Sequence, residues 1–119
     1  MYDVKILEKV GTCDSSLFEK MAKKGDLSAT KVIDIMGAEV SIKGYALCEI
    51  TTKEKTFNMY YYDTDEYGLI SAGSEIFYES VKDYYGEVDS VIIKEIKTKK
   101  GKTYKATPVL RTKKPETEE

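Results

Sequence analysis

Apolar and polar positions alternate most clearly over residues 39–50 and again over residues 57–62. In the first stretch, the residues of one parity are all apolar or small: Val40, Ile42, Gly44, Ala46, Cys48 and Ile50. In the second, Phe57, Met59 and Tyr61 alternate with Asn58, Tyr60 and Tyr62. Successive side chains of a strand point to opposite faces, and a polar turn at residues 51–55 separates the two stretches. The pattern predicts a long β-hairpin.

Shorter apolar clusters between turn signals predict further strands. We expect them at residues 2–10, 30–36, 69–72, 90–96 and 102–110. The last two would be joined by a basic turn at Lys99, Lys100 and Gly101.

Two helices are predicted from their end signals. Ser16 and Glu19 have the spacing of a capping box, and Gly25 is placed to stop the helix, which gives a short helix over residues 16–24. Ser74 is placed to cap a second helix that ends near Gly86. Its buried stripe would consist of Phe77, Val81 and either Tyr84 or Tyr85.

From residue 30 onward, the predicted order is strand, strand, short strand, helix, strand, strand. This is the layout of an OB-fold, a five-stranded barrel with a helix between its third and fourth strands. We therefore expect a mainly β domain over residues 1–112, with a short helix added near the N-terminus and a disordered acidic tail at 113–119. The first long barrel strand is expected to bend at Gly37 or Gly44. In such barrels two loops grip an oligonucleotide, and here they would be residues 51–55 and 97–102.

Composition narrows the class of protein. Apolar residues make up 41% of the chain and charged residues 34%, and no apolar run approaches the ~20 residues that cross a bilayer. The N-terminus lacks a secretory signal, so we expect a cytoplasmic protein without membrane contact. With two cysteines, Cys13 and Cys48, and no histidine, the chain suggests neither a zinc site nor a disulfide framework. We expect no cofactor, and catalysis is disfavoured.

The net charge of −2 conceals a strong pattern along the chain. Residues 1–62 are balanced, residues 63–89 hold eight acidic residues against one lysine, and residues 90–114 hold nine basic residues against Glu95 alone. Such a chain can fold into a molecule with one basic side despite its acidic total.

Aromatic rings flanked by lysines are suited to unpaired nucleic acid, because bases stack on rings and phosphates attract cations. By parity we assign Phe57, Met59 and Tyr61 to the core and turn Tyr60 and Tyr62 outward. The predicted stacking residues are Tyr60 and Tyr62, followed by Tyr45 and Tyr104. The predicted phosphate contacts are Lys43, Lys53, Lys55, Lys99, Lys100 and Lys102.

Residues 56–110 carry a tyrosine-rich strand, a segment at 71–77 that leads into a helix, and the sequence Lys99-Lys-Gly-Lys-Thr-Tyr104 in the last hairpin. This half of the chain resembles small single-stranded DNA-binding proteins encoded by phages and conjugative elements of Gram-positive bacteria. The resemblance implies an OB-fold that coats single strands during replication or transfer. Chromosomal bacterial relatives end in a hydrophobic dipeptide that closes with phenylalanine, whereas this chain ends in Glu118 and Glu119.

Several alternatives stay open. The tyrosines could be half-buried strand fillers, and the acidic tail could be a frayed end, a competitor for the basic groove, or a docking peptide for replication or transfer proteins. The helix at 16–24 is a candidate for self-association.

The chief rival function is a protein–protein interaction module, a phage or plasmid accessory factor that works through its acidic region 63–89. It would gain if Lys53 and Lys100 lay on opposite sides of the fold. A third hypothesis is a small hydrolase or nuclease that uses a metal and carboxylates, with the acids at 63–66 converging with Asp89.

Overall fold

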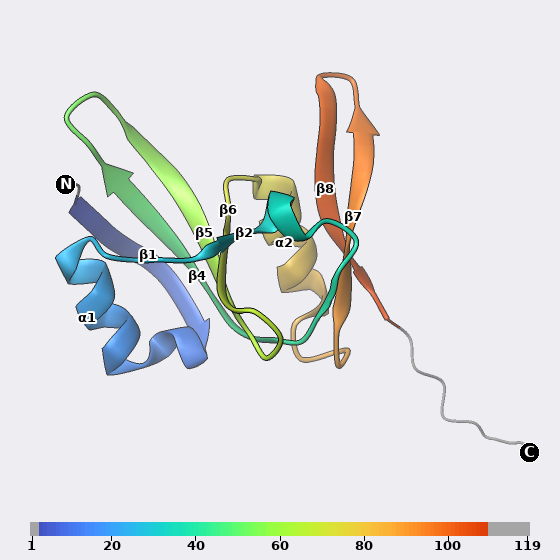
Figure 1. The fold of residues 1–119 in the computed structure, drawn as a ribbon, viewed down its shortest axis with the longest axis horizontal. Helices are drawn as coiled ribbons and strands as arrows, with labels where there is room; N and C mark the ends of the chain where they lie inside the picture. The colour runs from blue at the N-terminus through green and yellow to red at the C-terminus, as the bar shows by residue number, and fades with distance from the viewer. Residues whose placement is uncertain (1–2, 110–119) are drawn as a thin grey trace, which may run out of the picture.

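Two β-sheets organise the chain, and α-helices cover them (Figure 1). The computed structural model describes residues 3–109, and this part is mainly β. The strands are β1 (Asp3–Gly11), β2 (Thr30–Lys31), β3 (Glu39–Val40), β4 (Ile42–Thr51), β5 (Thr56–Thr64), β6 (Gly68–Ala72), β7 (Val91–Thr98) and β8 (Gly101–Pro108). The helices are α1 (Ser16–Lys24) and α2 (Glu75–Tyr84), with short 3-10 segments η1 (Thr12–Asp14) and η2 (Val32–Ile35).

The larger sheet has the order β1-β4-β5-β6-β2, and the smaller has the order β3-β7-β8. The long hairpin predicted from alternation is confirmed as β4 and β5, in a register that pairs Tyr45 with Tyr62 and Ile50 with Phe57. The final hairpin is confirmed as β7 and β8, which pair from Val91 with Pro108 to Thr98 with Gly101.

The chain passes from the small sheet to the large one at Ser41, between β3 and β4. Val40 pairs with Val91 in the small sheet, whereas Ile42 already pairs with Thr64 in the large one. The backbone N–H and the hydroxyl of Ser41 donate to the two carboxylate oxygens of Glu66, at 2.7 and 2.9 Å. The register of β4 with β5 also shifts between Ile42 and Gly44, so the irregular part of this strand ends at Gly44, one of the two glycines at which a bend is expected.

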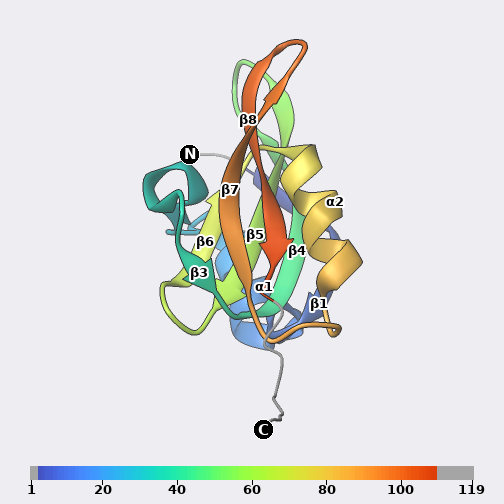
Figure 2. The same ribbon diagram turned by 90° about the vertical axis from the view of Figure 1, so that its right-hand side faces the viewer.

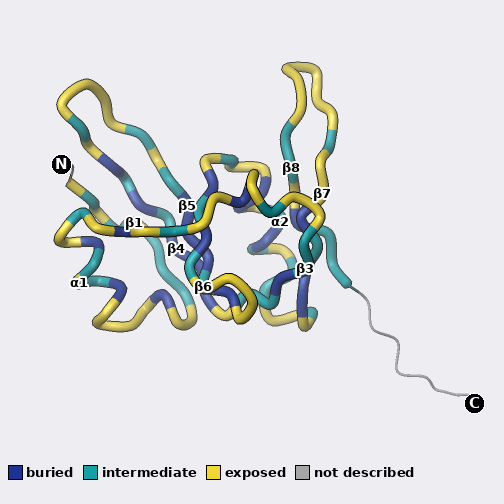
Figure 3. Tube along the Cα trace, viewed as in Figure 1, coloured by how far each residue is buried: buried dark blue, intermediate teal, exposed yellow. Residues whose placement is uncertain are grey.

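The large sheet is covered on both faces, so both parities of β4 and β5 are buried in their middle (Figure 3). On one face α2 and the small sheet enclose a core that includes Tyr45, Tyr60, Tyr62, Ile70, Phe77, Tyr78 and Ile93. On the other face α1 encloses a second core of Cys13, Phe18, Ala22, Leu27, Ala46, Cys48 and Tyr61. A strand that is buried on both sides has no polar face from which its orientation can be deduced.

Most predicted elements are present, with small shifts at their ends. The first helix is capped one residue earlier than expected, because Ser15 is the residue whose side chain accepts from the N–H of Phe18. Gly25 ends this helix in the left-handed conformation, as expected. The strand predicted for residues 30–36 is wrong beyond Lys31, because Val32–Ile35 form a 3-10 turn that buries Val32 alone.

Several expectations fall on residues that lie outside the described part of the chain. These are the acidic tail at 113–119, the end of the predicted domain at 112, and the terminal residues Tyr2 and Leu110 of two predicted strands. Within residues 3–109, neither helix has the length and apolar content needed to cross a membrane.

The ends of β1 and β4 cross at a close contact between two glycines, Gly11 and Gly44, which are paired in the register. A methyl group at Gly44 would lie 2.6 Å from the amide nitrogen of Thr12, 2.7 Å from that of Cys13 and 2.7 Å from the carbonyl oxygen of Val10. These are backbone atoms of the segment that leads into α1, so they cannot move aside cheaply. The crossing sets how closely α1 approaches the large sheet.

We predict that Gly44→Ala lowers the free energy of unfolding by ~1–3 kcal/mol, because the added methyl overpacks a backbone crossing. Urea unfolding followed by circular dichroism would measure the change. Gly73→Ala is the matched control, since a methyl there meets no atom within 4 Å. Equal stability of the two variants would show that the backbone at the crossing can separate to admit a methyl group.

Candidate nucleic-acid interface

Both lysine-bearing hairpin tips project from the body in the same direction. Figure 1 shows the β4–β5 tip and the β7–β8 tip projecting in the same general direction at the two ends of the body. In the perpendicular view of Figure 2 the two tips again project together beyond the helices. The two tips thus project in one direction while standing at opposite ends of the long axis of the molecule.

A threonine hydroxyl holds each tip in its turn. In the first, the hydroxyl of Thr52 accepts from the backbone N–H groups of Glu54 and Lys55, each at 3.2 Å. In the second, the hydroxyl of Thr98 donates to the carbonyl of Gly101 at 2.9 Å and accepts from the N–H of Lys100 at 3.3 Å. The lysine side chains are thereby carried on ordered turns.

The exposed lysines at these tips are Lys53, Lys55, Lys97, Lys99, Lys100 and Lys102. Two of them have local partners: Lys55 lies over the ring of Phe57 at 5.1 Å, and Lys102 lies 3.9 Å from the carboxylate of Glu95. Because the Lys102–Glu95 pair is exposed, it is weak and exchangeable, and the ammonium group stays accessible to an anion.

A cavity of about 130 Å³ lies between the two hairpins, because its lining includes Met59 of β5 and Tyr104 of β8. The lining is completed by Lys31, Ile33, Ser71, Ala72 and Gly73. The parallel pairing of β2 with β6 places Lys31 opposite Ser71. The cavity lining thus combines apolar side chains with one lysine and two hydroxyl-bearing residues, which suits a flat, partly apolar ligand that carries a negative charge nearby.

Tyr104 is half-buried and forms one wall of this cavity. Its ring packs edge-on against Phe77, with 5.5 Å between ring centres. Burial raises the pKa of its hydroxyl, and a hydrogen bond with the backbone of Gly73 partly offsets that effect. Of the four predicted stacking residues, Tyr104 is the only one that the structure leaves partly exposed.

The prediction that Tyr60, Tyr62 and Tyr45 present exposed rings is wrong. Their exposed fractions are 7%, 0% and 7%, respectively. Tyr60 and Tyr62 project to the face that α2 covers, where Tyr62 packs edge-on against Phe77 at 5.1 Å. Burial raises the pKa of all three hydroxyls, most strongly that of Tyr62.

The parity assignment on which that prediction rests is wrong for Tyr60 and Tyr62, whereas Tyr61 is buried as assigned, with an exposed fraction of 4%. Phe57 and Met59, assigned to the core by parity, are only partly buried, and Met59 lines the cavity between the hairpins. Tyr61 shares their face but is covered by α1, where it packs edge-on against Phe18 with 6.4 Å between ring centres. The face that carries accessible apolar groups is the one on which α1 covers only part of β5.

Lys43 does not belong with the other predicted phosphate contacts. It lies at the start of β4, whereas the hairpin tip follows the other end of that strand at Thr51. At ~3.3 Å per residue this places Lys43 about 25 Å from the tip along the strand. Its ammonium group lies 3.3 Å from Asp65 and 4.0 Å from Asp63.

Sequence reasoning did not assign Lys31, Ile33, Phe57 or Met59 to the candidate site. Lys31, Ile33 and Met59 line the cavity, and Phe57 lies beneath the ammonium group of Lys55. Ile33 is 63% exposed because η2 replaces the expected strand and turns the residue outward.

The carboxylates of the hydrolase hypothesis have structural partners. Asp63 and Asp65 lie near the ammonium group of Lys43, and Glu66 accepts hydrogen bonds from Ser41. Across residues 3–109, no three potential metal-binding side chains are grouped together.

Comparison with protein-family models, with curated proteins and with solved structures finds no match for this chain.

The tyrosine core is tied to β1 by a polar network. Tyr78 of α2 donates a hydrogen bond to the carboxylate of Glu8, and the ammonium group of Lys82 lies 3.3 Å from the same carboxylate. The hydrogen bond from Tyr78 is the main reason that the pKa of Glu8 is lowered, although burial opposes it. Stabilisation from a lowered carboxyl pKa is present above the unfolded-state pKa and is lost as the pH falls through the folded-state value.

We predict that Tyr78→Phe destabilises the protein by ~1 kcal/mol at neutral pH, because the variant lacks a hydrogen bond to a partly exposed charge. The difference from the unmodified protein should shrink as the pH falls through the lowered folded-state pKa of Glu8, because the carboxylate that accepts the hydrogen bond then becomes protonated. Urea unfolding at a series of pH values tests this. Tyr84→Phe is the control and should show no such pH dependence; a pH-independent effect of Tyr78→Phe would contradict the assigned hydrogen bond.

The hydroxyl of Tyr62 is the one buried side-chain polar atom without a hydrogen-bond partner in the described part of the chain. We predict that Tyr62→Phe raises the free energy of unfolding by up to ~1 kcal/mol, because it removes an unsatisfied buried group. Because the ring of Tyr62 is fully buried, the substitution should also leave any affinity of the protein for an oligonucleotide unchanged. Thermal unfolding and an oligonucleotide titration provide the two measurements, and weaker binding by a stably folded variant would restore Tyr62 as a contact residue.

Proposed function

We propose that this chain is a single-stranded DNA-binding protein of the OB-fold type that binds with little sequence preference. In this proposal it coats single strands during replication or transfer of a phage or mobile element, in the cytoplasm. The observation that carries the proposal is that two lysine-bearing hairpin tips project in the same direction, with a partly apolar cavity between their hairpins.

The strand connections support an OB-type barrel. Three consecutive antiparallel strands, β4, β5 and β6, are followed by α2 and then by the hairpin of β7 and β8. The bent β3–β4 segment joins the two sheets, because β3 pairs with β7 and β4 pairs with β5. An OB-fold is a partly open five-stranded barrel with this use of its first strand, and it grips oligonucleotides with the loops that here are the two lysine tips.

Phosphate binding is assigned to Lys53, Lys55, Lys99, Lys100 and Lys102. These ammonium groups are exposed, and they project from two supports that are far apart in sequence. A strand lying from one tip to the other would meet positive charge at both ends of its path. Such contacts release counterions and make the affinity fall as salt rises, without regard to base sequence.

Base contacts are assigned to the cavity between the hairpins. Met59, Ile33 and the exposed part of Tyr104 offer apolar surface, and Lys31 lies beside them. With Tyr45, Tyr60 and Tyr62 buried, few complete ring faces are left for stacking, and a stacked base is worth ~1–3 kcal/mol per ring. The affinity should therefore come mainly from charge and depend steeply on salt.

The compartment and the class of protein are supported more indirectly. Cys13 and Cys48 are both free, buried thiols, which is consistent with a reducing cytoplasm. Burial raises the pKa of each thiol to about 12, so neither is a reactive nucleophile.

A titration of fluorescently labelled oligo-dT at low and high salt tests the function directly. We expect binding at micromolar protein in low salt and marked weakening as salt rises, with oligo-dA and oligo-dC bound similarly and duplex DNA bound less well. Absence of binding to all single strands in low salt would end the proposal.

We predict that Lys99→Gln combined with Lys100→Gln weakens binding and lowers the slope of log affinity against log salt by up to ~1.4, or ~0.7 for each phosphate that is no longer neutralised. Lys53→Gln combined with Lys55→Gln should weaken binding and lower the slope to a similar extent, because both tips contact the same nucleic-acid strand in this proposal. The matched control is Lys23→Gln with Lys24→Gln, which removes two exposed charges from α1. An equal weakening in the control would mean that net charge, and not the hairpin tips, determines the affinity.

A further inference from the structure

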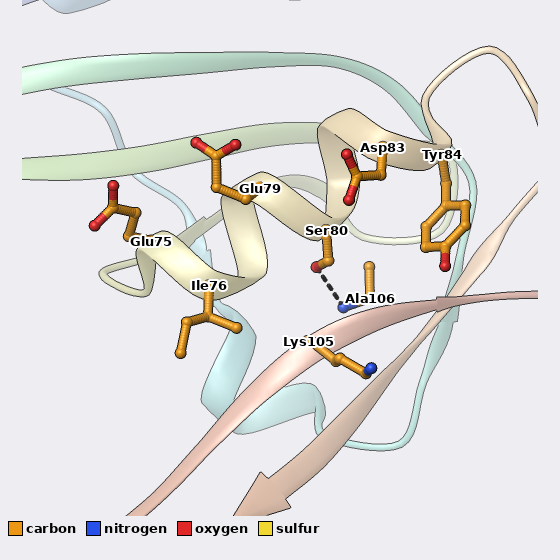
Figure 4. Close-up of a pocket in the computed structure, with 8 residues that line it drawn as sticks. All are labelled: Glu75, Ile76, Glu79, Ser80, Asp83, Tyr84, Lys105 and Ala106. Carbon is orange, nitrogen blue, oxygen red and sulfur yellow. Dashed lines mark hydrogen bonds between the residues drawn. The ribbon is translucent and has the colours of Figure 1, made fainter. Parts of the chain in front are cut away.

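Helix α2 and strand β8 form an open groove of about 430 Å³ on the surface (Figure 4). The groove is distinct from the cavity between the hairpins, with which it shares no lining residue. It is fixed in shape because the hydroxyl of Ser80 accepts a hydrogen bond from the backbone N–H of Ala106 at 2.8 Å, which holds β8 against the helix.

Two adjacent rows of α2 side chains line this groove, as the four-residue spacing of a helix requires. One row is acidic and consists of Glu75, Glu79 and Asp83. The other includes Ile76, which is 46% exposed, and Tyr84. Figure 4 shows the carboxylates spread along the length of the helix.

The charge of the groove is unbalanced. Lys105 of β8 supplies the one ammonium group in the lining, against three carboxylates. Within residues 3–109, none of the three acidic residues takes part in an ion pair with another side chain. A groove with exposed apolar surface and excess negative charge is complementary to a slender, basic segment.

The chain itself carries such a segment in the tip of β7 and β8. Four lysines lie within six residues there: Lys97, Lys99, Lys100 and Lys102. All are exposed, and the hairpin that carries them projects from the body (Figures 1 and 2). The tip cannot reach the groove of its own molecule, because β8 runs straight from the tip to the groove and separates Gly101 from Lys105 by roughly 13 Å of extended strand.

We propose that the lysine tip of one copy docks in the acidic groove of a second copy. Tip and groove are different surfaces, so the contact is heterologous and can continue from copy to copy in a head-to-tail row. Three of the tip lysines, Lys99, Lys100 and Lys102, are phosphate contacts proposed above, so single-stranded nucleic acid would compete with the docked groove. This competition rests on the proposed function, whereas the docking itself does not.

Sedimentation velocity of the full chain tests the docking. In low salt the unmodified protein should associate increasingly with concentration, and in 0.5 M salt, where the Debye length is ~4 Å, it should be monomeric. Two charge-reversed variants should each weaken association by about tenfold or more: Lys99→Glu with Lys100→Glu, and Glu79→Lys with Asp83→Lys. All four positions are exposed, and circular dichroism would verify folding.

The decisive measurement is an equimolar mixture of the two charge-reversed variants, in which every reversed tip can meet a groove of opposite sign. We expect the mixture to associate although neither variant does so alone. Lys53→Glu with Lys55→Glu is the control and should associate as the unmodified protein does. A monomer at all concentrations in low salt, association that survives either reversal, or a mixture that stays monomeric would each overturn the proposal.

Competition is measured separately, by adding oligo-dT to the associated protein. We expect oligo-dT to release monomers that are bound to the oligonucleotide. If self-association is not reduced by oligo-dT, the proposal that the same lysines bind both the groove and the nucleic acid is wrong. Glu79→Lys with Asp83→Lys leaves the nucleic-acid contacts intact, so it should retain binding to oligo-dT. A protein that associates but does not bind DNA would refute the proposed function and leave the docking standing.

Discussion

The structure depends on covering the large sheet on both of its faces. Tyr60 and Tyr62 project from β5 to one face and Tyr61 to the other, and neither set of rings can be left in water without removing a large part of the core. Helix α2 and the small sheet bury the first set, and α1 buries the second. The need to cover both faces of the large sheet accounts for the positions of the two helices. It also accounts for the bend at Ser41 and for the crossing at Gly44.

Double coverage leaves only the ends of the long hairpin free for function. The middle of β4 and β5 is occupied by packing, whereas beyond it the same strands continue into a tip that no helix covers (Figure 3). The β7–β8 hairpin extends in the same way on the far side. The cavity between the hairpins of the two basic tips is lined by the exposed Ile33 and by the partly buried Met59 and Tyr104.

The acidic and basic parts of the sequence are separated in space as well as along the chain. The acidic row of α2 lies beside the base of the β7–β8 hairpin, and the lysines are at its tip. The hairpin keeps the two charges of one molecule apart, so each is available to an external partner. A small total charge is thus compatible with strong local binding of either sign.

Local patterns in the chain were enough to predict most of the strands, both helices and the two lysine turns, because alternation, caps and glycine stops act over a few residues. They could not predict which side of β5 faces the interior. Residues 57–62 carry apolar groups at both parities, so only the cover supplied by α1 and α2, both distant in sequence, decides that Tyr60 and Tyr62 are buried and that Met59 is accessible. Ile33 likewise lines the cavity because residues 32–35 form a 3-10 turn, which their β-branched side chains did not predict. Lys43 is far from the hairpin tip because it lies at the opposite end of β4. Short-range physics specified the elements, whereas burial, a property of the assembled chain, specified which residues remain able to bind.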